Sequence, residues 1–263
     1  MYPYTLFWEI DLYVLMIGLG LLAAIILFRV LSDKKKLPAK LFTFFLLVAV
    51  GSIFVGFFCA LLFQSFYNYL ASGVWRWQGM TFFGGLVGGV VCFVIFYFLI
   101  GHFVFKDKEH VLQFPSFASC AAPCIAAAHA LGRVGCLFAG CCYGIKSDSF
   151  GLPMLIDGVW EKRVPTQLLE AIFLLLLMGV LLFLLLKKDS RYPLQIYLIS
   201  YGVWRFGIEY LRDDPRGSSG ISFLTPSQLT SLLLILVGVA GVLLYKYLYP
   251  KLLKRPKAND AQE

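Results

Sequence analysis

The chain contains 263 residues, of which 60% are hydrophobic and only 14% are charged, and its mean hydropathy is +0.80. Soluble domains carry about a quarter charged residues, so this composition excludes an ordinary globular protein and indicates an integral membrane protein. The net charge of +8 does not indicate nucleic acid as a partner, because the basic residues are not interleaved with aromatic ones.

The N-terminal sequence MYPYTLFWEIDLYVLM has no basic region and no small-residue cleavage site. We therefore expect no removable signal peptide, and we expect the first hydrophobic segment to remain in the protein as a membrane span.

Seven apolar segments follow one another along the chain. A helix needs roughly 20 apolar residues to cross a bilayer core. Five segments meet this requirement clearly, 8–31, 41–70, 81–105, 166–186 and 226–249, and two meet it weakly, 115–135 and 192–212. Their long unbroken runs exclude the alternating strands of about ten residues that form membrane barrels. The sequence predicts an all-α polytopic protein with about seven transmembrane helices in a single membrane-embedded domain, residues 1–250, followed by a basic tail, residues 251–263.

The distribution of basic residues predicts the orientation of these spans. The first, third and fifth connections and the tail carry Lys34, Lys35, Lys36, Lys40, Lys106, Lys108, Lys187, Lys188, Arg191, Lys246, Lys251, Lys254, Arg255 and Lys257, whereas the opposite side carries Arg76, Lys146, Lys162, Arg163, Arg212 and Arg216. Cytoplasmic loops are enriched in Lys and Arg, so we expect the N-terminus outside and the C-terminus in the cytoplasm. The long polar loops 136–165 and 213–225 then lie at the outer face, where we expect the functional site.

Charged residues inside apolar segments are the first candidates for this site, because a charge in lipid is costly. Arg133 lies at the outer end of the fourth span, and Arg205 and Glu209 lie in the sixth. The i,i+4 spacing places Arg205 and Glu209 on one helix face, with Arg212 one turn further along. Such a pair could simply neutralise itself so that the helix inserts. Several guanidinium groups at an interface also suit a phosphate, because each presents a planar fork of donors.

Two further segments combine small or polar residues with the start of a span. The segment GMTFFGGLVGG, residues 79–89, places Gly84 and Gly85 where they permit either close helix packing or the approach of a ligand head group, and the spacing does not decide between these. In VPTQLLEA, residues 164–171, Thr166 is expected to cap the fifth helix, whereas capping does not account for Gln167. Tyr13, at the start of the first span, suits an interface anchor.

The stretch HALGRVGCLFAGCCYG, residues 129–144, concentrates three of the seven cysteines. Cys136, Cys141 and Cys142 allow a disulfide, a metal site with His129, or a thiolate made reactive by nearby cations. The spacing H-x6-C-x4-C-C lacks the paired C-x2-C knuckles of structural zinc sites, so we predict no bound metal. The remaining cysteines, Cys59, Cys92, Cys120 and Cys124, are expected to act as small packing residues.

Five segments, in order and at matching spacing, resemble those of the prolipoprotein diacylglyceryl transferase family. GRVGCLFAGCCYG (132–144) is similar to the family signature GRxGNFxNGExxG, and GMTFFGGLVGG (79–89) is similar to GMxFHGGLxG. DLYVLM (11–16), VPTQLLE (164–170) and YGVWRFGIEYLR (201–212) resemble WYGLM, HPSQLYE and YGxxRxxxExxR. The departures from these motifs include Phe83, Cys136 and Cys141, where the family has histidine, asparagine and glutamate.

The resemblance implies a membrane transferase of the bacterial inner membrane, with its active site toward the outer face and no cofactor. Its expected partners are phosphatidylglycerol, the lipobox signal peptide of a preprolipoprotein and the surrounding membrane lipids. The reaction moves the diacylglyceryl unit to the lipobox cysteine thiol and releases glycerol phosphate. The alternatives are a divergent lipid-binding paralogue with another acceptor or without catalysis, a transporter, and a metal-binding membrane protein.

The resemblance also implies roles for individual residues. Arg133 is expected to contact the phosphate of the lipid. From the sequence itself, the i,i+4 spacing predicts that His129 and Arg133 share one helix face, and we hypothesise that His129 is the general base in place of the histidine that Phe83 replaces. The expected catalytic residues are Tyr13, His129, Arg133, Arg205 and Glu209, and the expected substrate-binding residues are Gly84, Gly85, Arg133, Cys136, Cys141, Gly144, Gln167, Glu170, Arg205 and Arg212.

Overall fold

The computed structural model describes residues 5–7, 10–156, 158–214, 223–247 and 249 of the chain. The predicted basic tail, residues 251–263, lies outside the described residues.

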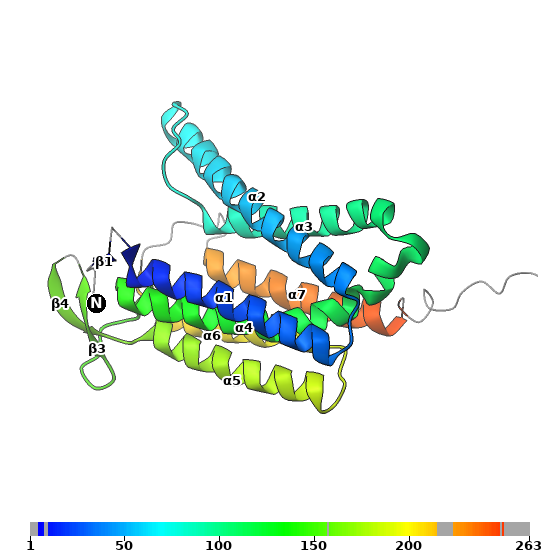
Figure 1. Cartoon of the computed structure of the whole chain (residues 1–263). Coiled ribbons are helices and arrows are strands. Elements are labelled where there is room, and N and C mark those ends of the chain that lie inside the picture. Colours follow the sequence, from blue (N-terminus) through cyan, green and yellow to red (C-terminus); the bar gives the residue numbers. More distant parts are fainter. Residues whose placement is uncertain (1–4, 8–9, 157, 215–222, 248, 250–263) are drawn as a thin grey trace, which may run out of the picture. The chain divides into compact units, whose positions relative to one another are not determined.

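Each of the seven predicted apolar segments is α-helical over most of its length (Figure 1). These helices are α1 (Leu12–Lys34), α2 (Ala39–Ser72), α3 (Phe82–Val104), α4 (Glu109–Ala139), α5 (Thr166–Leu186), α6 (Pro193–Ile208) and α7 (Pro226–Tyr247). All except α6 are long and apolar enough to cross a membrane, which confirms a polytopic helical membrane protein. Helix α6 has 16 residues and continues into the 3-10 turn Glu209–Leu211, so its spanning the membrane and the orientation of the bundle remain predictions.

Short β-hairpins depart from the predicted all-α fold. One pairs β1 (Thr5–Phe7) with β2 (Ile10–Asp11), and the other pairs β3 (Leu152–Ile156) with β4 (Val159–Arg163) in an antiparallel register that joins Leu152 to Arg163. The second hairpin belongs to the long polar loop between α4 and α5. Gly158 turns it with a φ of +82°, a conformation that costs glycine little.

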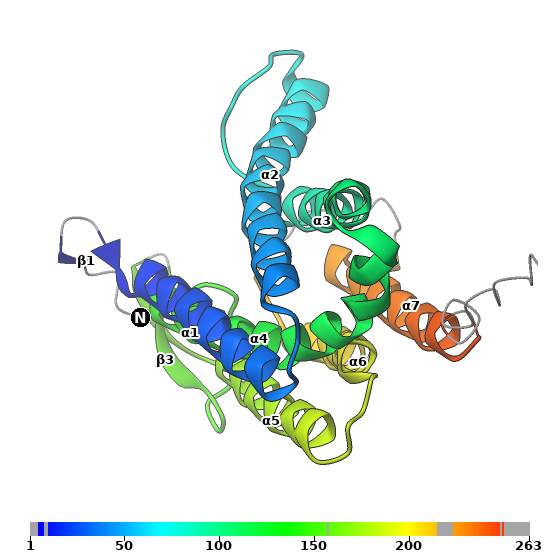
Figure 2. The ribbon, with the colours of Figure 1, turned by 45° about the vertical axis from the view of Figure 1, so that its right-hand side comes forward.

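The chain forms two compact units, Met1–Leu31 with Ala118–Glu263, and Ser32–Phe117. In the first unit, three alanines of α4 at i,i+4 spacing pack against α5 and α6, and the shared core consists of Ala122, Ala126, Ala130, Leu174, Leu177, Leu181, Tyr197 and Tyr201. Both views show α1, α4 and α5 side by side, with the β3–β4 hairpin beyond the end where α4 finishes and α5 begins (Figures 1 and 2). We call that end, where Arg133 of α4 meets Glu170 of α5, the polar end of the first unit.

Two glycines set the contact of α1 with α4. A Cβ atom at Gly20 would lie 3.1 Å from the carbonyl oxygen of Ala128, and one at Gly135 would lie 3.2 Å from Cδ2 of Tyr13. The backbone of α4 therefore approaches the start of α1 directly. This contact places the ring of Tyr13 beside Gly135, the residue before Cys136.

In the second unit, the glycine-rich start of α3 packs against α2. A Cβ atom at Gly85 would lie 3.2 Å from Cβ of Ala60, and one at Gly84 would lie 2.6 Å from Cβ of Phe63. Across the same contact, a Cβ atom at Gly56 would lie 2.9 Å from the carbonyl oxygen of Gly85. Close helix packing therefore accounts for Gly84 and Gly85 in this structure, and their contact with a substrate remains a prediction.

Gly56→Ala should lower the free energy of unfolding by about 1–3 kcal/mol, because the added methyl group overpacks the α2–α3 contact. Gly51→Ala is the matched control on the same helix, because a Cβ atom there would meet nothing within 4 Å. Denaturant unfolding of both variants in detergent micelles measures the difference, and equal stability of the two variants would contradict the proposed contact.

Candidate active site

Glu170 is the centre of a buried polar cluster in the first unit. Its side chain, on the first turns of α5, has no exposed surface. Its Oε1 atom accepts a hydrogen bond of 2.7 Å from the hydroxyl of Tyr201 and lies 3.1 Å from Nε of Arg133. A buried carboxylate requires such partners, because burial of an unpaired charge is strongly unfavourable. Three helices thus contribute to a single ionic contact.

His129 belongs to the same cluster. Its Nε2 atom lies 3.9 Å from Oε1 of Glu170, and its Nδ1 atom lies 3.0 Å from the hydroxyl of Tyr197. The prediction that His129 and Arg133 share one face of α4 is confirmed, because both side chains approach the same carboxylate oxygen. The imidazole is one quarter exposed, unlike the glutamate beside it.

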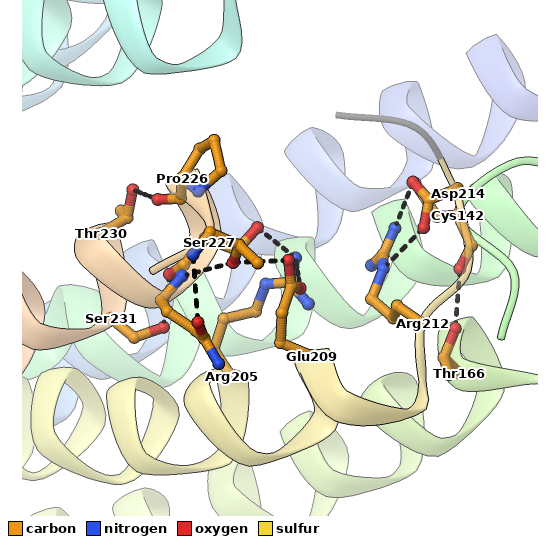
Figure 3. A network of polar contacts seen from close by, with 12 residues as sticks. Cys142, Thr166, Arg205, Glu209, Arg212, Asp214, Pro226, Ser227, Thr230 and Ser231 are labelled. Carbon is orange, nitrogen blue, oxygen red and sulfur yellow. Dashed lines mark hydrogen bonds and ion pairs between the residues drawn. The ribbon is translucent and has the colours of Figure 1, made fainter. Parts of the chain in front are cut away.

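A second ionic contact joins α6 to the start of α7. Nη2 of Arg205 lies 3.1 Å from Oε2 of Glu209 and donates a hydrogen bond of 2.8 Å to the hydroxyl of Ser227 (Figure 3). The other carboxylate oxygen of Glu209 accepts a hydrogen bond from Thr225. The predicted i,i+4 pair is confirmed, and it also holds the N-terminus of α7.

Arg212 departs from the predicted helix face. Helix α6 ends at Ile208, and Arg212 follows the 3-10 turn with an extended backbone, φ −96° and ψ 148°. Its guanidinium forms a two-pronged contact with Asp214, 2.9 Å from Nε to Oδ1 and 3.0 Å from Nη2 to Oδ2 (Figure 3). The prediction that Arg212 lies one turn beyond Glu209 on the same helix was therefore wrong, because the helix ends at Ile208.

The segment that contains Gly144 connects these groups through its backbone. The Gly144 amide donates to the carbonyl of Val164, and the Ile145 amide donates to the carbonyl of Leu211, both at 2.9 Å. A Cβ atom at Gly144 would lie 2.5 Å from the Leu211 oxygen and 2.8 Å from the Val164 oxygen. Only glycine fits between these carbonyls, which explains the residue without a substrate contact.

The start of α5 holds the end of the cysteine segment. Thr166 donates through Oγ1 to the carbonyl of Cys142 at 2.7 Å, and Gln167 donates through Nε2 to the carbonyl of Cys141. The prediction that Thr166 caps α5 was wrong: it is the first helical residue, and its hydroxyl bonds to another segment. Gln167, for which capping gave no account, has a role in positioning this turn.

The turn after α4 brings three sulfur atoms together. The Sγ atoms of Cys136, Cys141 and Cys142 lie within 4.8 Å of one another, and all three thiols are free. Hydrogen bonds from the Cys136 and Cys141 thiols, followed by the charges of Arg212 and Arg133, lower the pKa of Cys142. Hydrogen bonds with Cys136 and Cys142 raise the pKa of Cys141.

Several residues of the two ionic clusters were not predicted from the sequence. These are Tyr197, Tyr201, Asp214, Thr225 and Ser227. Tyr201 begins the motif YGVWRFGIEYLR, so a signal was available for it. Thr225 and Ser227 lie among ordinary helix-start residues, and their contact with α6 depends on how the chain folds.

The family of this chain follows from comparison with known proteins. The model of the prolipoprotein diacylglyceryl transferase family matches residues 4–244, so the chain belongs to this family of membrane transferases. The chain is 32% identical over 252 residues to phosphatidylglycerol--prolipoprotein diacylglyceryl transferase 2 of Clostridium perfringens, an alignment that covers 89% of each chain.

Other relatives carry the same enzyme name. The phosphatidylglycerol--prolipoprotein diacylglyceryl transferase of Clostridium tetani is 32% identical over 62% of each chain. That of Dehalococcoides mccartyi is 30% identical over 66% of this chain and 64% of its own. The resemblance read from the five motifs is confirmed.

Glu170→Ala should lower the free energy of unfolding by about 3–5 kcal/mol, because Arg133, whose side chain is only 16% exposed, would then be a largely buried charge without its counter-ion. The double variant Arg133→Met/Glu170→Leu should regain much of this loss, since it removes both charges. Denaturant unfolding in micelles compares the two, and a Glu170→Ala protein as stable as the wild type would show that the contact is not needed for folding.

Proposed function

We propose that this chain transfers the diacylglyceryl unit of phosphatidylglycerol to the lipobox cysteine thiol of preprolipoproteins and releases glycerol phosphate. The match of the family over residues 4–244 carries this proposal. The names of these relatives state the lipid and the prolipoprotein as their substrates, and we extend both to this chain.

We further propose that one membrane domain, residues 1–250, crosses the bacterial inner membrane seven times, with α6 as the seventh span. The N-terminus then lies outside, and the polar end of the first unit faces outward. The excess of basic residues in the connections assigned to the cytoplasm supports this orientation.

Three arginines are proposed to bind the lipid phosphate. Arg205 and Arg212 use part of each guanidinium for Glu209 and Asp214, and in the described part of the chain their Nη1 atoms are buried without a hydrogen-bond acceptor. Buried donors of this kind need an acceptor. A phosphate oxygen meets that need, and charge growing on the leaving phosphate strengthens the contact in the transition state. Arg133 is the third arginine, oriented by Glu170.

His129 is proposed to accept the proton of the acceptor thiol. The thiolate is the nucleophile, and an unperturbed thiol is mostly protonated at neutral pH. The imidazole is one quarter exposed, so it can approach a substrate thiol and accept its proton. The thiolate then attacks the glyceryl carbon, the C–O bond to phosphate breaks, and glycerol phosphate leaves with the bonding electrons.

The remaining predicted residues are proposed to shape the substrate site. Tyr13 lies beside Gly135 at the end of α4, and Gln167 holds the turn that carries Cys141. Cys136 and Cys141 stand where the family has polar side chains, so their thiols would face the substrates.

The direct test incubates the purified protein in micelles with labelled phosphatidylglycerol and a lipobox peptide. We expect both products, the thioether-linked peptide and glycerol phosphate, in equal amounts. Lipid binding without release of glycerol phosphate would instead identify a binding paralogue. A serine in place of the peptide's cysteine should abolish both products.

Arg205→Lys should reduce the turnover number for glycerol phosphate release by about 10²- to 10³-fold, the usual loss when one donor to a developing anion is removed. Lysine keeps the positive charge for Glu209 but lacks the guanidinium fork. The control is Lys187→Ala, which removes an exposed charge at the opposite end of α5 from Glu170. Equal turnover in both variants would exclude a phosphate role for Arg205.

His129→Ala should reduce lipidation at neutral pH by about 10²- to 10⁴-fold, the range for loss of a general base. The rate should recover partly as the pH approaches about 8.5, where the free thiol ionises without help. His102→Ala, an exposed histidine of the second unit, is the matched control. Persistence of full activity in His129→Ala at neutral pH would reject the base.

A further inference from the structure

The cysteine turn has a geometry that the transfer reaction does not require. Cys136 lies in the last turn of α4, and Cys141 and Cys142 follow directly after the helix. Gly140 and Cys142 adopt φ values of +68° and +63°. The left-handed conformation is unfavourable for a residue with a Cβ atom, so the fold holds Cys142 in a strained conformation.

This strained turn is fixed from several sides. The Cys141 amide donates to the carbonyl of Cys136 at 3.2 Å, and Thr166 and Gln167 hold the carbonyls of Cys142 and Cys141. The result is that three sulfur atoms, from a spacing of C-x4-C-C, lie within 4.8 Å of one another. A single ion with metal–sulfur bonds of about 2.3 Å can bind three sulfurs at such separations with small adjustments.

The surroundings suit thiolates bound to a metal. The backbone of Arg212 pairs with Gly144, two residues after Cys142, and Arg133 lies about one turn before Cys136 on α4, so two cations near the turn would balance the negative charge that three thiolates leave on a divalent ion. Cys141 is exposed, whereas Cys136 and Cys142 are partly buried, so an ion could enter from the solvent side. Among the described residues, the group of ligand atoms within 4.8 Å of one another consists of these three cysteines and does not include His129.

We propose that Cys136, Cys141 and Cys142 bind one thiophilic metal ion, zinc(II) or copper(I), as three thiolates. Soft thiolate ligands select these ions over magnesium or calcium. Because the described residues supply three ligands, a fourth position on zinc is left for a water molecule or an added thiol. The site goes beyond the proposed function and does not rest on it, since metal binding requires neither the lipid nor the peptide.

The test measures metal in the full-length protein, purified in detergent under reducing conditions without chelator and then dialysed against zinc or copper(I). Elemental analysis should find about one equivalent of metal per chain, as expected for a single site. Cobalt(II) in place of zinc should give thiolate-to-metal charge-transfer absorption, which changes when a small thiol occupies the fourth position.

Cysteine variants assign the site. Cys136→Ser and Cys142→Ser should each weaken metal binding by about tenfold or more, since each removes one of the three ligands. Cys124→Ser is the matched control on α4, where a serine hydroxyl can keep the hydrogen bond to the carbonyl of Cys120. Cys141→His should retain the metal with a weaker cobalt charge-transfer band, because one sulfur becomes nitrogen. Circular dichroism checks that each variant remains helical.

The outcomes separate clearly. Metal bound by the wild type and Cys124→Ser but lost from folded Cys136→Ser supports the site, and elemental analysis distinguishes zinc from copper. Equal metal content in the wild type and the triple serine variant overturns it. A disulfide between two of the three cysteines that persists in protein purified under reducing conditions also overturns it. Failure of the lipidation assay leaves these readouts unchanged, so the two proposals fail independently.

Discussion

The arrangement of the first unit depends on a carboxylate that has no contact with solvent. Glu170 is fully buried, and Arg133 and Tyr201 supply its partners from two other helices. Because an unpaired buried charge is so unfavourable, this contact fixes α4, α5 and α6 relative to one another at their polar end. It also holds the Nε atom of Arg133, and His129 lies 3.9 Å from the same carboxylate oxygen.

Close backbone contacts complete this constraint. Alanines on α4 bring α5 and α6 near, and Gly135 brings in the start of α1 with Tyr13. In membranes, where lipid and side chains are equally apolar, such small residues allow the van der Waals contacts that hold helices together. The helices then carry the polar side chains, and side chains on helices are held more precisely than side chains on loops.

The loops add what the helices cannot supply. Gly144 lies between the carbonyls of Leu211 and Val164, so the segment after α4 is joined both to the end of α6 and to the start of α5. Arg212, on an extended backbone beside this contact, approaches the same region as the three cysteines. The motif resemblance implies that Cys136 and Cys141 replace polar residues of the family, while the arginines of the motifs are kept.

The sequence by itself determined the helical membrane fold, the approximate positions of all seven helices and the family, because apolar length and motif order are local properties of the chain. It also predicted the Arg205–Glu209 pair, which depends only on helical spacing. Only the tertiary structure decided that Glu170 neutralises Arg133, that Thr166 bonds to Cys142 rather than capping α5, and that Arg212 leaves the helix. It alone showed that the three cysteine sulfurs lie close together, because the left-handed backbone at Cys142 cannot be predicted from the spacing C-x4-C-C.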